Sequence, residues 1–67
     1  MTEQELTKDI NDLLESMNSL YHGYLEQDEM KYKIAILVSM KIGAVAIADD
    51  VTELKKILQN TTRVVEE

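Results

Sequence analysis

The sequence predicts an all-α protein folded as an antiparallel hairpin of one short and one long helix. The long helix is predicted from an apolar row whose members are seven residues apart: Met30, Leu37, Ala44, Val51 and Leu58. A second row with the same spacing has one polar member: Lys33, Met40, Ile47 and Leu54. Together the rows alternate as in a helix that buries one side against another helix. Proline is absent and only two glycines are present, which disfavours a β protein.

The short helix is expected over residues 3–25. Thr2 and Glu5 have the spacing of a capping box. The apolar positions form two rows seven residues apart and two flanking positions: Leu6, Leu13 and Leu20; Ile10, Met17 and Tyr24; Leu14 and Tyr21. The opposite face is polar, so this helix is amphipathic. Gly23 lies inside the pattern, and the register continues through Leu25, which favours a helix that includes the glycine.

The long helix is expected over residues 28–60, after a turn at 26–28 in which Asp28 is suited to cap it. Residues 34–48 contain only Ser39 and Lys41 as polar side chains, so more than one face of this stretch should be buried. Asp49 and Asp50 could instead cap a third helix, and three helices with a break at 49–50 is the alternative fold. One continuous helix is favoured because the apolar rows continue past the two aspartates without a phase shift.

A homodimer is predicted because the two arms differ in length. At about 1.5 Å per residue they span roughly 35 Å and roughly 48 Å, so apolar positions of the long arm overhang the short one. A chain of this size buries only about 60% of its unfolded surface, and the absence of cysteine excludes disulfides. Two hairpins packed as a four-helix bundle would cover the overhang. The predicted interface residues are Ala35, Ser39, Gly43, Ile47, Val51, Leu54 and Leu58.

The whole chain, residues 1–67, is expected to be a single domain with a frayed tail at 61–67. Its net charge is −6, from 13 acidic and 7 basic residues, which disfavours binding to phosphate backbones. The acidic N-terminus does not resemble a signal peptide, which predicts a cytoplasmic protein. A membrane span is not expected either, because residues 34–48 are shorter than the required length of about 20 and contain Lys41.

No catalytic, metal or cofactor site is expected. His22 and Glu26 are four residues apart, but no further ligand has a suitable spacing. A phosphate-binding loop, a nucleophile elbow and a Cys–His couple are absent from the sequence. Paired carboxylates for hydrolysis need a cleft, which two helices do not provide. The sequence therefore predicts a protein that is not an enzyme.

The aromatic residues and the histidine gather near the turn: Tyr21, His22, Tyr24 and Tyr32. Tyrosine is enriched at binding hot spots, which makes this group a candidate recognition tip. The simpler interpretation is that the rings cover the open end of the bundle with their hydroxyls in water.

The expected function is binding to another protein, as a small acidic regulator, inhibitor, adaptor or assembly factor that uses helix-in-groove contact. Acidic residues would steer a basic partner. One alternative is a structural subunit of a homo-oligomer, joined at Ala35, Ser39 and Gly43. Another is a small helical nucleic-acid-binding protein that uses two lysine pairs: Lys31 with Lys33, and Lys55 with Lys56.

Overall fold

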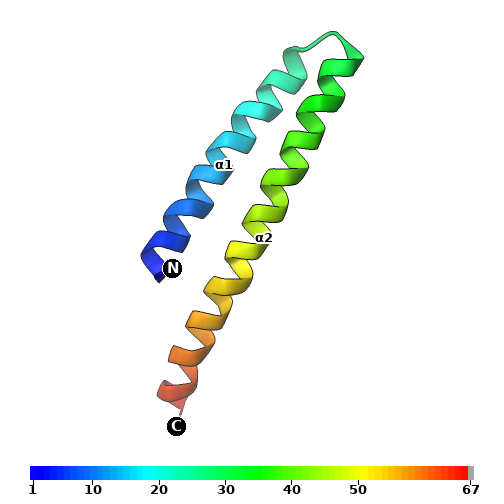
Figure 1. Ribbon diagram of the computed structural model, residues 1–67. Coiled ribbons are helices and arrows are strands. Elements are labelled where there is room, and N and C mark those ends of the chain that lie inside the picture. Colours follow the sequence, from blue (N-terminus) through cyan, green and yellow to red (C-terminus); the bar gives the residue numbers. More distant parts are fainter. Residues whose placement is uncertain (67) are drawn as a thin grey trace.

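The computed structural model describes the backbone of residues 1–66 and the side chains of residues 1–60. It consists of two antiparallel helices, α1 (Glu3–Glu26) and α2 (Met30–Glu66), joined by a loop at 27–29 (Figure 1). The predicted all-α hairpin is therefore confirmed. The chain is elongated, with Cα extents of 57 × 17 × 15 Å. The long arm runs past the start of α1, as predicted from the unequal helix lengths.

Helix α1 begins with the predicted capping box. The Thr2 backbone N–H donates to Glu5 Oε1 at 2.9 Å, and the Glu5 backbone N–H donates to Thr2 Oγ1 at 3.2 Å. These hydrogen bonds satisfy amides that the first helical turn leaves without partners. The helix includes Gly23, as the apolar register predicted, and it ends when Gln27 adopts an extended conformation with φ −82° and ψ 129°.

Helix α2 begins at Met30, two residues later than predicted. The Glu29 carbonyl accepts from the backbone N–H groups of Tyr32 at 3.1 Å and Lys33 at 3.0 Å. The residue that flanks the helix is therefore Glu29, and Asp28, the predicted cap, lies within the loop. The physical reason is that the chain uses residues 27–29 to reverse direction. Within this loop the Glu29 N–H donates to Gln27 Oε1 at 3.2 Å.

Helix α2 passes through Asp49 and Asp50 without a break, so the three-helix alternative is wrong. Across this point the Thr52 hydroxyl donates to the Ala48 carbonyl, one helical turn earlier, at 2.9 Å. The helix extends to Glu66, beyond the predicted end at 60. The predicted fraying of the tail at 61–67 stays a prediction, because the side chains of these residues and the backbone of residue 67 lie outside the described part of the chain.

The two predicted rows of α1 face α2. Leu6 is fully buried, and the other five members are partly buried: Ile10, Leu13, Met17, Leu20 and Tyr24. On α2 all of the partly buried positions except Ala46 also alternate by three and four: Lys33, Ile36, Met40, Gly43, Ile47, Asp50, Leu54 and Ile57. Gly43 lies against Met17, because a Cβ added to this glycine would stand 3.2 Å from Met17 Cγ. These alternations form the seam between the helices.

Half of the seam predicted for α2 is wrong. The row that contains Met40 faces α1, but the row from Met30 to Leu58 is exposed along its whole length. The row that takes its place is Ile36, Gly43, Asp50 and Ile57. The physical reason is a fit between the helices, since the Met17 side chain occupies the space beside Gly43. Residues 34–48, predicted to be buried on more than one face, are covered on only one within a single chain.

Candidate binding face

The exposed row of α2 continues onto α1. On α1, Leu14 and Tyr21 each come one position after a residue of the seam. On α2, Leu37 and Ala44 each come one position after a residue of the seam. Two antiparallel helices are related by a two-fold axis perpendicular to the plane that contains both of them. Residues that follow the seam by the same number of positions on each helix therefore lie on the same side of the pair. We call this side the outer apolar face and define it by nine exposed residues: Leu14, Tyr21, Leu25, Met30, Ile34, Leu37, Ala44, Val51 and Leu58.

The large side chains of this face are substantially in contact with water, from 44% exposed for Leu58 to 75% for Met30. A residue four positions after a member of the exposed row, on either helix, lies on the same side of that helix. These residues are Asn18 and Leu25 on α1, and Ile34, Lys41, Ala48 and Lys55 on α2. None of these is acidic, although the chain has 13 acidic residues. Depletion of charged residues is typical of the core of a protein interface, and the row itself has no charged member, whereas Lys41 and Lys55 lie beside it.

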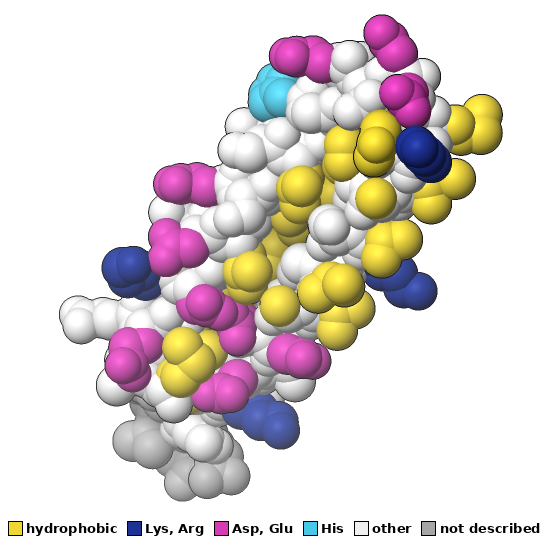
Figure 2. Space-filling view, turned by 45° about the horizontal axis from the view of Figure 1, so that its top comes forward, with side chains coloured by type: hydrophobic (Ala, Val, Ile, Leu, Met, Phe, Trp, Pro, Cys, Tyr) yellow, Lys and Arg dark blue, Asp and Glu magenta, His cyan; other side chains and the backbone are white. Residues whose placement is uncertain are grey.

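Acidic groups gather on the opposite side of the hairpin, near the start of α1. Asp9 and Glu53 each precede a seam residue by one position, which is the reverse of the offset found on the outer apolar face. The N-terminal ammonium of Met1 lies 3.5 Å from Glu53 Oε2. Figure 2 shows one face of the hairpin, on which acidic side chains lie along α1 and at both ends and hydrophobic side chains lie along α2. The register therefore places Asp9 and Glu53 away from the outer apolar face, although α2 also exposes Val38, Ile42 and Val45 outside that face.

Asp50 is the acidic member of the seam. A hydrogen bond with the Asp9 side chain, burial, and repulsion by Asp9, Glu53 and Asp49 raise the pKa of Asp50 to about 6. While both carboxyls of the Asp9–Asp50 pair are ionised, Asp50 Oδ2 is shielded from water and has no donor. A proton shared with Asp9 supplies that donor. This pair was not predicted from the sequence, because nothing in the α2 pattern shows which α1 residue meets Asp50.

An open apolar groove of about 350 Å³ lies beside the start of α1. It is lined by Val51, Leu54, Lys55, Leu58 and Gln59. This is the part of α2 expected to overhang, and it adjoins the outer apolar face through Val51 and Leu58. The groove therefore extends the face toward the C-terminal end of α2.

The seven residues predicted as one interface are divided between different sides of α2. Gly43, Ile47 and Leu54 are partly buried in the seam of the hairpin, whereas Val51 and Leu58 belong to the outer apolar face. The other two, Ala35 and Ser39, are exposed, and the Ser39 hydroxyl donates to the Ala35 carbonyl at 3.2 Å. Because Met17 already occupies the space beside Gly43, this small-residue stripe offers a second chain no continuous path.

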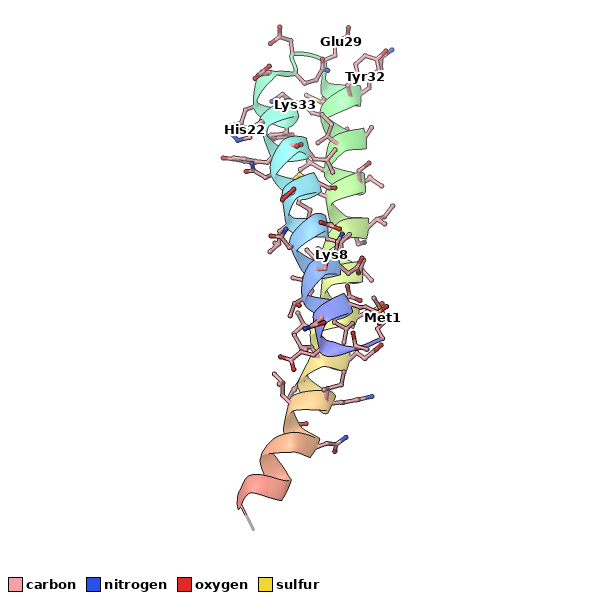
Figure 3. The ribbon with its side chains drawn as sticks, turned by 90° about the vertical axis from the view of Figure 1, so that its left-hand side faces the viewer. Met1, Lys8, His22, Glu29, Tyr32 and Lys33 are labelled. Atoms are coloured by element: carbon pink, nitrogen blue, oxygen red, sulfur yellow. The ribbon has the colours of Figure 1, made fainter. Side chains whose placement is uncertain are left out.

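The residues of the candidate recognition tip lie near the loop without converging. The rings of Tyr21 and His22 are 5.9 Å apart and tilted by 55°. Figure 3 shows His22 and Tyr32 on opposite sides of the hairpin. Lys31 Nζ lies 5.1 Å from the centroid of the Tyr32 ring. Tyr24 is partly buried and engaged by Lys33, so of the four only Tyr21 joins the outer apolar face.

Among residues 1–60, no three histidine, cysteine or acidic side chains are arranged to hold a metal ion. No helix in the described part of the chain is long and apolar enough to cross a membrane. Comparisons with known protein families, with curated proteins and with solved structures find no match. Any function must therefore be inferred from the hairpin itself.

Proposed function

We propose that this protein is a non-enzymatic binding protein whose working surface is the outer apolar face. The observation that supports this most strongly is the exposure of Leu14, Tyr21, Leu37 and Val51 on one side of a strongly acidic chain. Scattered apolar residues are normal on protein surfaces, whereas a continuous apolar side marks an interaction site. Its role would be that of a regulator, adaptor or assembly factor.

Binding at this face would use helix packing. The exposed row follows one side of α2 at heptad spacing, so a partner helix can lie along it and along the neighbouring Leu14 and Tyr21 of α1. The seam stays closed during binding, because its side chains are already packed within the chain. Acidic residues on the opposite side, such as Asp9 and Glu53, lie away from the contact and act on the approach of a partner through their field.

The test uses two matched variants of α2. Val51 is 48% exposed on the outer apolar face, and Val45 is 54% exposed on a different side of the same helix. Immobilised wild type, Val51→Asp and Val45→Asp are each incubated with a lysate of the source organism supplemented with untagged wild-type chain. We expect wild type and Val45→Asp to retain a stoichiometric protein, either the untagged chain or a different protein, that Val51→Asp loses.

Two results would overturn the proposal. In one, the wild type retains no stoichiometric protein, including its own untagged copy. In the other, all three baits retain the same protein equally, which would place the contact away from Val51. Far-ultraviolet circular dichroism of the free baits shows whether the helical content of Val51→Asp matches that of Val45→Asp.

A further inference from the structure

We infer that the occupant of the outer apolar face is a second copy of this chain, and that two hairpins pair through it into a four-helix bundle. This rests on the proposed function, since it names the partner of the same surface. The contact is isologous, with the same residues contributed by both chains.

The hairpin exposes more surface than expected for a folded monomer of its mass, and the excess is close to the area that one partner buries in a protein interface. A folded monomer of 7.7 kDa is expected to expose about 4,300 Å². The hairpin exposes 5389 Å², an excess of about 1,000 Å² over that expectation. A standard protein interface buries about 800 Å² on each partner. A standard contact with one further copy of the chain would therefore remove most of this excess.

The width of the apolar surface on α2 also fits a bundle. A helix that packs against one neighbour needs two apolar rows, whereas a helix in the core of a bundle needs a third beside them. In α2 the rows of Met40 and Ile36 form the seam, and the row of Leu37 lies next to them without a cover. Two neighbouring helices account for all three rows, one from the same chain and one from the second copy.

The charge distribution favours this partner. Each chain has a net charge of −6, so most approaches of two copies bring acidic side chains together. Among residues 1–60, the outer apolar face is the side on which the helices carry no acidic residue, and Lys41 and Lys55 lie at its margin. A strongly basic partner would find no carboxylate there. A second copy presents the same apolar centre and, within the described part of the chain, brings no acidic residue into the contact.

The sizes of the side chains allow close approach in the middle of the face. Ala44 and Ala48, both exposed, lie between the larger residues Leu37 and Val51. Small residues at the centre of a helix pair bring the backbones together, and larger residues on either side fill the space beyond. The open groove beside the start of α1, lined in part by Leu54 and Leu58, is covered when the second hairpin extends past the first.

Sedimentation equilibrium of purified wild type, Val51→Asp, Val45→Asp and Leu14→Gln tests the inference. We expect wild type and Val45→Asp to have twice the chain mass of 7.7 kDa. Val51→Asp should have the mass of one chain, and Leu14→Gln should dissociate at higher concentration than wild type. The Leu14 variant keeps the test informative if Val51→Asp unfolds on dissociation, because it removes apolar area without adding a charge.

A wild-type mass of one chain would overturn the inference, and so would a Val51→Asp variant that stays dimeric. An unchanged dissociation constant for Leu14→Gln would also contradict it, because α1 would then take no part in the contact. The two proposals fail differently. A monomeric wild type that retains a different protein, lost in Val51→Asp, leaves the proposed function standing without the second copy. A wild type that retains nothing removes both.

Discussion

The ammonium of Lys33 lies 4.1 Å from the centroid of the Tyr24 ring and donates a hydrogen bond of 3.0 Å to the Tyr24 backbone oxygen. This oxygen belongs to the last turn of α1, where the usual helical donor four residues later is missing, and it also accepts a longer hydrogen bond of 3.4 Å from the Gln27 N–H. Helix α1 has no basic residue of its own in that turn. Lys33 of α2 therefore supplies the positive charge that stabilises the carboxyl end of α1, which explains why a lysine occupies an otherwise apolar row.

Replacing Lys33 with methionine should lower the free energy of unfolding by about 1–2 kcal/mol, because a charged hydrogen bond and a cation–π contact are lost. Methionine keeps most of the apolar stem, so packing changes little. Lys31→Met is the matched control, since Lys31 is exposed and lies 5.1 Å from the neighbouring Tyr32 ring. Urea unfolding measures both variants. Equal stability of the two would show that the contact with Tyr24 contributes nothing measurable.

The two glycines should respond differently to alanine. Alanine is favoured over glycine by about 1 kcal/mol inside a helix. At Gly23 the new Cβ would lie 3.9 Å from Ile36 Cδ1, an ordinary contact, so Gly23→Ala should give most of this gain. At Gly43 it would lie 3.2 Å from Met17 Cγ and 3.4 Å from its sulfur, so the Met17 side chain must shift. We expect Gly43→Ala to give less than half the gain of Gly23→Ala in urea unfolding.

Gly43→Leu should lower the stability of the hairpin by about 1–3 kcal/mol, because it overpacks the seam. The substitution would therefore report on the contact within one chain rather than on a contact between chains. A gain of stability from Gly43→Ala equal to that from Gly23→Ala, measured under the same conditions, would contradict the close approach of the helices at Met17.

Stability should depend on the protonation of Asp50. Its pKa is raised from 3.8 to about 6 in the folded chain by the hydrogen bond with Asp9, by burial and by nearby acidic groups. The folded state then binds this proton more tightly than the unfolded state. The stabilisation is fully present below pH 3.8 and is lost as the pH rises through about 6. Asp50→Asn, which keeps a donor for Asp9, should retain its stability over this range.

Urea unfolding from about pH 4 to about pH 7 compares wild type with Asp50→Asn and with Asp28→Asn, a control in the loop. The comparison cancels other titrating groups, including Glu5, whose pKa is lowered by its hydrogen bonds with Thr2. We expect wild type and Asp28→Asn to lose stability relative to Asp50→Asn as the pH rises. Parallel profiles for all three proteins would show that Asp50 does not share a proton in the folded chain.

The features of the fold that depend on one helix alone were predictable from the sequence. Thr2 and Glu5 signal the start of α1 by their spacing, and the rows of Leu6 and Ile10 have one apolar side to bury. Helix α2 has three adjacent rows with apolar members, and periodicity alone does not show which two of them meet α1. The structure selects the row with Gly43 and Asp50, because a large residue opposite a small one is a property of two helices together.

The candidate binding face was also predictable only in part. The apolar character of Leu37, Val51 and Leu58 is visible in the sequence, but their exposure appears only when α1 is placed against the neighbouring row. The predicted stripe of Ala35 and Ser39 depended on Gly43 being free, and Met17 takes that position. Residue size and heptad spacing therefore indicate the candidates for contact, whereas the register of the partner helix decides which of them remain uncovered.

The central claim is that α2 uses one pair of rows within the chain and the neighbouring row between chains. Thermal unfolding of the wild type over about a hundredfold range of protein concentration tests it most directly, because only an oligomer gains stability by mass action. We expect the midpoint to rise by at least about 5 °C from the lowest to the highest concentration. A midpoint that stays constant over the whole range would contradict the claim.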